Sequence, residues 1–476
     1  MRRMHEITPA QAEAAIRTAK SRPEFALLLE AATVGWDPLG EALDEVIGFL
    51  RDPQLRDALR GSVACDAELE RALTHLRRCF LLRGEIDASA FDFACALAQQ
   101  GFNNDYAWFV ADDEIAPLRA LEGETGAMLQ AGTAPAAALE RALAIAALYA
   151  PLHRLPEWRR MLAWPAERLS EAFRPIWQEQ VLQHAEELEL REQITALTPV
   201  RDAVSSDVRA QYEESPYPRW FTFERPAPQP GTGAILVAGC GTGKHPVHTA
   251  LAYPRCEVLA VDLSRASLAY AVRMARRFGA RNLSFHQADI LELGSLGRRF
   301  ERIETIGVLH HLADPLAGWR VLAGLLLPGG LMRVALYSER ARAPLAATRE
   351  FIRQHGFEAT AEGIRRCRRA ILELPGEHPA RTALESDDFF SSMGFRDLVM
   401  HVCEHRFTLP EIAAAMRALG LELHAFECAP DLVARFRSMF PDPAAAVDLA
   451  CWDRFEERHP DSFRGMYRFY CRKPAV

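Results

Sequence analysis

The sequence predicts an α/β fold, with a doubly wound sheet in the second half of the chain and an all-α N-terminal domain before it. Three observations support this prediction. The first 200 residues show helical periodicity alone, short apolar strands alternate with helices after residue 233, and prolines gather between the two regions. Strands that alternate with helices at such spacing form βαβ units, whose parallel sheet is covered on both faces.

The all-helical N-terminal domain is expected over residues 1–200. Apolar residues recur at helical spacing throughout it, and Pro and Gly separate the runs. A 34-residue helical-hairpin repeat is not evident. The expected helical runs cover residues 39–50, 69–80, 88–100, 136–149 and 175–196.

Residues 201–233 are expected to form an arm or linker, because five prolines lie between positions 211 and 233. The second domain is expected over residues 234–476. Its strands are expected at 235–238, 257–261, 283–286, 303–308, 331–336, 421–428 and 466–472, and its helices at 246–253, 265–278 and 316–327. Residues from about 338 to 406 are expected to be a helical insertion. A capping box at Thr408–Glu411 starts the next helix and Gly420 ends it.

Composition and charge exclude several classes of protein. The chain has 476 residues, 25% of them charged, and a net charge of −8, which gives no electrostatic reason to expect nucleic acid or an anionic membrane as a partner. Only Lys20, Lys244 and Lys473 are lysines, and we attribute this arginine excess to a GC-rich bacterial genome. It weakens any argument from a basic patch, so the run Arg365, Arg366, Arg368 and Arg369 is expected to be a solvated helix face.

The cysteines and the N-terminus predict a cytoplasmic protein. Ten cysteines never form C-x-x-C, so neither a zinc ribbon nor a thioredoxin motif is expected, and they lie in apolar stretches as reduced core cysteines would. The first residues carry no apolar segment of a signal peptide, and no 18-residue apolar window predicts a membrane span.

A glycine-rich loop is the first sign of chemistry. The strand at 235–238 runs into Gly239-Cys240-Gly241-Thr242-Gly243, the next strand ends at Asp262, and Asp289 follows the third. Glycines allow a close approach of ligand to backbone, and an acid at the end of the second strand suits a ribose diol. A P-loop does not fit, because Ala238 and His245 replace its required residues. A dinucleotide site, and hence a nicotinamide-dependent oxidoreductase, stays open as an alternative.

These segments resemble the class I S-adenosylmethionine-dependent methyltransferases. The resemblance rests on VAGCGTG (237–243), AVD (260–262), QAD (287–289), GVLHHLADP (307–315) and LLLPGGLMRVALYS (325–338). It implies the seven-stranded sheet of that family, with antiparallel sixth and seventh strands. YEESPYPRW and HRFTLPEIAAAMRALGLEL are similar to a bacterial group with a helical, often tetratricopeptide-type, N-terminal region, from which this chain departs in lacking clear repeats.

The resemblance implies S-adenosylmethionine as cofactor and methyl transfer to an acceptor. The implied cofactor residues are Gly239, Cys240, Gly241, Gly243, Asp262, Leu263, Asp289, Ile290 and Val308. The candidate catalytic residues are His310, His311 and His405, and those for the acceptor are Tyr212, Tyr217, Trp220, Tyr337 and His401. The alternatives are that His310 and His311 only shape their loop, and that the aromatic residues of the arm pack a linker.

The acceptor itself is not identified by the sequence. A helical domain of 200 residues is more than a small metabolite requires, so a peptide or protein acceptor is favoured. His401 and His405 have the spacing of one helical turn, but no cluster supplies a third ligand, so no metal is expected. A non-catalytic scaffold whose helical half binds a partner is a further alternative.

Overall fold

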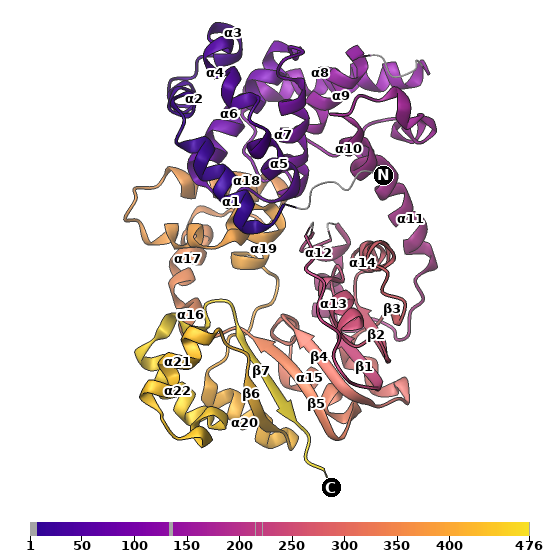
Figure 1. Cartoon of the computed structure of the whole chain (residues 1–476), viewed down its shortest axis with the longest axis vertical. Coiled ribbons are helices and arrows are strands. Elements are labelled where there is room, and N and C mark those ends of the chain that lie inside the picture. Colours follow the sequence, from indigo (N-terminus) through magenta and orange to yellow (C-terminus); the bar gives the residue numbers. More distant parts are fainter. Residues whose placement is uncertain (1–6, 133–136, 215, 221, 476) are drawn as a thin grey trace. The chain divides into compact units, whose positions relative to one another are not determined.

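The computed structural model describes residues 7–132, 137–214, 216–220 and 222–475 (Figure 1). They form two compact units. The first consists of Met1–Glu186 and Ala347–Met400, and the second of Glu187–Ala346 and His401–Val476. Within the described ranges, no helix is both long enough and apolar enough to cross a membrane.

A seven-stranded sheet forms the centre of the second unit (Figure 1). Its strand order is β3-β2-β1-β4-β5-β7-β6, and β7 runs antiparallel to both β5 and β6. Because β6 therefore runs in the same direction as β1–β5, the expected antiparallel direction holds for β7 and is wrong for β6. This arrangement confirms the predicted doubly wound sheet. The strands are β1 (Gly233–Ala238), β2 (Cys256–Asp262), β3 (Leu283–Gln287), β4 (Phe300–Ile306), β5 (Leu326–Leu336), β6 (Glu422–Phe426) and β7 (Tyr467–Arg472).

Helices cover both faces of the sheet, because successive residues of each strand point to opposite faces and both sets of side chains are apolar. On one face, Ile235 and Val237 of β1 pack with Leu268 of α14 and with Leu190 of α11. On the other, Leu236 and its neighbours pack with α15, α20 and α22. The helices of this unit are α11 (His184–Gln193), α12 (Ala203–Glu214), α13 (Lys244–Ala252), α14 (Arg265–Phe278), α15 (Pro315–Leu325), α16 (Glu339–Arg342), α20 (Leu409–Leu419), α21 (Pro430–Met439) and α22 (Leu449–Arg458).

The first unit is helical, as the sequence predicts. Its N-terminal segment contains α1 (Pro9–Lys20), α2 (Pro23–Val34), α3 (Pro38–Glu41), α4 (Leu43–Leu50), α5 (Pro53–Gly61), α6 (Ala67–Arg83), α7 (Phe91–Asn103), α8 (Asp112–Gln130), α9 (Ala137–Ala147) and α10 (Arg174–Trp177). The single helix expected at 39–50 is wrong, because Ala42 leaves the helical conformation and separates α3 from α4. The run expected at 175–196 contains a π-helical segment, Gln178–Gln183.

Residues 347–400, expected as an insertion of the second domain, belong to the compact unit of the N-terminal helices. They contain α17 (Ala346–His355), α18 (Ala361–Glu373) and α19 (Ser392–Val399). Arg368 of α18 is 1% exposed, and its Nη2 lies 2.7 Å from Oε2 of Glu70 on α6. Arg365 donates to the carbonyl of Tyr106, and burial lowers its pKa to about 10. The expectation of a fully solvated arginine face is therefore wrong for these two residues, which hold the two segments together.

A buried carboxylate joins β4 to the helix that follows the glycine loop. Glu304 is 2% exposed and accepts hydrogen bonds from Nε of Arg302 at 2.6 Å and from Oγ1 of Thr249 at 2.7 Å. Nε2 of His245 lies 2.7 Å from its Oε2. Burial by itself raises the pKa of Glu304, but His245 and Arg302 outweigh it and hold that pKa well below its ordinary value. The cluster fixes the start of α13.

Replacing Glu304 with glutamine is expected to lower the free energy of unfolding by about 2 to 3 kcal/mol, because it leaves the partly buried Arg302 guanidinium without its counter-ion. The depressed pKa means that this stability is present above the ordinary glutamate pKa of 4.5 and is lost as the pH falls below it. Denaturant unfolding of both proteins at several pH values measures the difference. Glu257→Gln, on exposed β2 surface, is the control and should change stability by less than about 0.5 kcal/mol.

Candidate cofactor and acceptor site

The glycine loop connects β1 to α13 in a conformation that needs glycine. Gly239, Gly241 and Gly243 have φ of 73°, 51° and 85°, which side chains other than glycine rarely adopt. A Cβ on Gly239 would lie 2.3 Å from Cγ2 of Val308, and one on Gly243 would lie 2.5 Å from Cβ of Ala271. The loop therefore passes tightly between the end of β4 and α14.

Gly239→Ala is expected to weaken the affinity for the proposed cofactor by about tenfold or more, because the added methyl group strains φ and displaces Val308. Val308→Ala removes both Cγ atoms and should restore part of the affinity, since only the strain in φ and the longer 2.9 Å contact with Cβ of residue 308 persist. A double-mutant cycle by calorimetry measures this coupling. If Gly239→Ala and the double variant Gly239→Ala, Val308→Ala had equal affinities, the steric explanation would be contradicted.

Asp262 closes the other side of the loop from the end of β2. Its Oδ2 accepts the amide hydrogen of Gly241 at 2.8 Å, and its Oδ1 accepts that of Ser264 at 2.9 Å. Burial raises the pKa of Asp262, although these backbone hydrogen bonds oppose the shift. A carboxylate offers about four acceptor positions, so two more donors such as the hydroxyls of a diol can still bind.

Asp289 lies just after β3 and has an unused oxygen. Its Oδ1 accepts the amide hydrogen of Leu291 at 3.0 Å. Its Oδ2 is buried and has no hydrogen-bond partner among the residues that the structure describes. Burial raises the pKa of Asp289, although the amide of Leu291 and the nearby hydroxyl of Ser205 oppose the shift. A buried carboxylate oxygen without a donor is costly, so this atom is matched to a ligand that brings an N–H or O–H group.

The other predicted cofactor residues surround these two acids. Cys240 is buried, and burial raises the pKa of its thiol well above the ordinary value, so it is a neutral wall residue. The carbonyl of Leu263 accepts a hydrogen bond from Gln287. Ile290 packs in the apolar cluster that contains Leu236 and residues of α15, and Val308 lies against Gly239.

The arm before β1 is attached to the outside of the glycine loop. Nε1 of Trp220 donates to the carbonyl of Thr242 at 2.9 Å, and the Trp220 ring stacks on Phe278 with centroids 5.4 Å apart. The Tyr217 carbonyl lies 3.5 Å from the position of a Cβ on Gly241. Trp220 is thus buried in packing against α14. The expectation of an irregular arm over residues 201–233 is wrong for its first part, because α12 (Ala203–Glu214) forms there and contains Tyr212.

Histidines gather beyond the carboxyl ends of β4 and β5. The His310 ring is fully buried and stacks on Tyr337, with centroids 4.0 Å apart. Neither ring nitrogen of His310 has a hydrogen-bond partner within the described ranges of the chain. Burial, followed by the charges of His311 and Arg342, holds the pKa of His310 well below its ordinary value. The imidazole is therefore neutral at physiological pH, and one of its ring nitrogens carries a free lone pair.

His311 and His401 form a second stacked pair, with ring centroids 3.7 Å apart. Nδ1 of each ring lies 2.7 Å from the carbonyl oxygen of Cys403. Burial lowers the pKa of His311 to about 4. Nε2 of His401 lies 3.4 Å from the hydroxyl of Tyr212. Four of the predicted residues from separate parts of the sequence, Tyr212, His311, Tyr337 and His401, therefore lie in one region with His310.

The helical spacing assigned to His401 and His405 is wrong. Residues 401–406 follow the end of α19 as a loop, and Phe407 forms a parallel bridge with Ser338. The amide of His405 donates to the carbonyl of His310 at 2.8 Å, so His405 contacts the site through its backbone. The spacing of four residues between His401 and His405 suggested a helix. The bridge from Phe407 to Ser338, just after β5, instead keeps the segment extended, and the sequence alone does not show this contact.

Sequence reasoning missed two contributions to the site. Arg342 lies over the ring of Tyr337, 3.7 Å from its centroid, and donates to Oε2 of Glu404 at 2.8 Å. The hydroxyl of Thr198 accepts the amide hydrogen of Asp289 at 2.8 Å. An arginine in an arginine-rich chain and a threonine before a predicted linker carry no local signal, so only the tertiary fold reveals them.

Comparison with known proteins identifies the central segment. Residues 235–330 match the family model described as a methyltransferase domain, which confirms the resemblance noted in the sequence. A Synechococcus protein described as uncharacterized is 31% identical over 264 residues, which cover 50% of this chain and 63% of that protein. A ubiquinone biosynthesis O-methyltransferase of Cereibacter sphaeroides is 31% identical over 113 residues, or 24% of this chain and 44% of that enzyme. The chain thus spans less than two thirds of either relative.

A solved structure of PKMT2 from Rickettsia typhi in complex with AdoHcy is similar to part of this fold. It is 15% identical, with a TM-score of 0.39, and the match covers 58% of this chain and 53% of that one.

Proposed function

We propose that this chain is an S-adenosylmethionine-dependent methyltransferase. The observation that carries the proposal is the pair of acids at the ends of neighbouring strands, Asp262 with acceptor capacity to spare and Asp289 with a buried, unpartnered Oδ2. This pair suits a nucleoside: Asp262 would accept the ribose hydroxyls, and Asp289 the amino group of adenine. The backbone of Gly239–Gly243 would hold the amino-acid end.

The bound cofactor supplies an electrophilic methyl group, so the protein mainly aligns the acceptor and excludes water. His310 is the residue best suited to take a proton from the acceptor. Its ring is neutral, buried and without a hydrogen-bond partner among the described residues, and it follows β4 at the edge of the sheet where ligands bind in doubly wound folds. We assign orientation of the acceptor to His311, Tyr337, Tyr212 and His401, and a backbone role to His405.

The strand order favours this function over a nicotinamide-dependent oxidoreductase. A dinucleotide fold has the order 3-2-1-4-5-6 with parallel strands, whereas here antiparallel β7 lies between β5 and β6. The glycine spacing Gly239, Gly241, Gly243 also places its third glycine one residue earlier than the dinucleotide motif does.

A peptide or protein is the acceptor class that we favour, because the helical unit is large and separate from the sheet that holds the cofactor residues. Incubating the chain with methyl-labelled S-adenosylmethionine and a size-fractionated bacterial lysate tests both levels of the proposal. Label in the protein fraction supports the full proposal. Label solely in the small-molecule fraction would keep the methyltransferase and exclude the protein acceptor, and no enzyme-dependent label in any fraction would count against transfer itself.

A further inference from the structure

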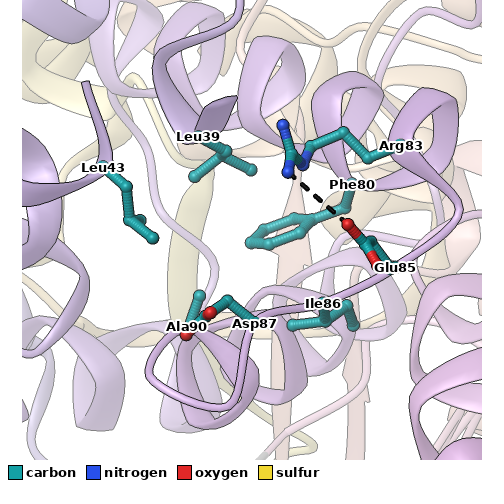
Figure 2. A pocket seen from close by; sticks show the side chains of 8 residues that line it. All are labelled: Leu39, Leu43, Phe80, Arg83, Glu85, Ile86, Asp87 and Ala90. Carbon is teal, nitrogen blue, oxygen red and sulfur yellow. Dashed lines mark ion pairs between the residues drawn. The ribbon is translucent and has the colours of Figure 1, made fainter. Parts of the chain in front are cut away.

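A small cavity lies in the first unit, among elements that the proposed function does not use (Figure 2). Its volume is about 150 Å³, similar to that of cavities known to hold a benzene-sized group. Phe80 from the end of α6, Leu39 of α3, and Ile86 and Ala90 from the loop after α6 are buried and form its apolar walls. The cavity therefore has the size for one side chain, and its mixed lining suits one that is partly apolar and partly polar.

Carboxylates dominate the mouth of this cavity. Glu85 and Asp87 line it and are exposed, and Arg83 is the basic residue among its lining residues (Figure 2). The Arg83 guanidinium is already matched, because it lies 3.0 Å from Asp37 and 3.7 Å from Glu85. Hydrogen bonds from Ser89, helped by the charges of Arg51 and Arg83, lower the pKa of Asp87, so this carboxylate is ionised at neutral pH.

The surrounding segments strengthen this negative character. Residues 37–45 and 83–90, which supply seven of the eight lining residues, contain six acidic residues and the single basic residue Arg83. Large apolar side chains are also exposed in adjoining turns, Val34 at the end of α2 and Leu82 in the last turn of α6. A recess with both apolar and acidic walls, and apolar side chains nearby, matches a polypeptide rather than an isolated anion or a neutral lipid.

We propose that this cavity binds a lysine or arginine side chain of a basic polypeptide segment. The methylene stem would occupy the apolar recess against Phe80, and the cationic end would reach the carboxylates of Asp87 and Glu85. This site goes beyond the proposed function and does not depend on it. If the acceptor is a protein, the cavity provides a second point of attachment outside the methyl-transfer site.

Fluorescence anisotropy with the full chain tests the proposal. The probe is a short fluorescein-labelled peptide with lysines between leucines, compared with the same peptide carrying norleucine or glutamate at the lysine positions. We expect the lysine peptide to bind most tightly. Asp87→Asn should weaken its binding about three- to fivefold, and the double variant Glu85→Gln, Asp87→Asn about tenfold, as partly screened charge pairs do. Ala90→Leu, which fills the recess, should weaken it at least as much.

Several results would overturn the proposal. The first is that the norleucine peptide binds as tightly as the lysine peptide, and the second is that unlabelled butylamine competes as well as the unlabelled lysine peptide does. The third is that Glu124→Gln, which replaces an exposed acid on α8 and serves as the matched control, weakens binding as much as Asp87→Asn. Absence of binding by the lysine peptide would overturn it as well. Each protein is also titrated with S-adenosylmethionine. Intact cofactor binding without peptide binding refutes the cavity alone, and peptide binding without cofactor binding refutes the proposed function alone.

Discussion

Replacing Asp262 with alanine is expected to weaken the affinity for S-adenosylmethionine by about 100-fold or more. Two charge-assisted hydrogen bonds to a ribose diol contribute about 1.5 to 3 kcal/mol each, and both are lost. The substitution also removes the acceptors for the amides of Gly241 and Ser264, which loosens the glycine loop. Isothermal titration calorimetry on the purified chain measures the change.

Two companion variants separate ligand binding from folding in this experiment. Glu257→Gln lies on the same strand, is exposed and pairs with Arg298, so it should leave the affinity within about twofold of wild type. Asp289→Asn keeps the size of the side chain but replaces one carboxylate oxygen with an NH₂ group. We expect about tenfold weaker binding, because this group cannot accept a hydrogen bond from the ligand. An unchanged affinity in Asp262→Ala would show that the ligand does not use this carboxylate.

Replacing His310 with leucine is expected to reduce methyl transfer by about 100-fold or more, which is the usual contribution of a positioned general base. Binding of the cofactor should change little, because the glycine loop and the two acids are untouched. The measurement is label transfer into the lysate fraction that the wild-type chain modifies, at saturating cofactor. His424→Gln, an exposed histidine on β6, is the matched control and should retain full activity.

The free energy of unfolding of His310→Leu is a second readout. A purely structural role of His310 predicts that it falls, whereas a catalytic role predicts that it does not. The ring nitrogens of His310 have no hydrogen-bond partner within the described ranges, so leucine should keep or raise the free energy of unfolding at neutral pH. Its pKa in the folded state lies well below the ordinary 6.5, so the wild-type chain should lose stability relative to His310→Leu as the pH falls below about 6.5. A large loss of stability at neutral pH in His310→Leu would assign the residue to packing instead.

Local patterns predicted the sheet unit well, because its strands and helices are specified by short-range signals. The helix expected at 265–278 is α14 with the same bounds, and the capping box of Thr408 and Glu411 starts α20 as predicted. Antiparallel β7 followed from the family resemblance rather than from its own residues. Both acids of the cofactor site lie at strand ends, where the alternation of strands and helices alone locates them.

The features that the sequence did not predict depend on distant contacts. Residues 347–400 join the N-terminal helices through the buried pair Arg368 and Glu70, which lie 298 positions apart. A run of arginines in an arginine-rich chain looks solvated, and burial becomes visible only with the partner in place. The loop at 401–406 is similar, since its spacing resembles a helix while the backbone of His405 bonds to His310 and the next strand-like residue, Phe407, bridges Ser338 just after β5.

The central claim is that this chain binds the methyl donor through its glycine loop and two acids. Titration of the wild-type chain with S-adenosylhomocysteine, followed by the same titration in the presence of excess NADH, tests it most directly. We predict one site with micromolar affinity that excess NADH does not displace and that S-adenosylmethionine does. Binding weaker than millimolar, or displacement by NADH but not by S-adenosylmethionine, would contradict the claim.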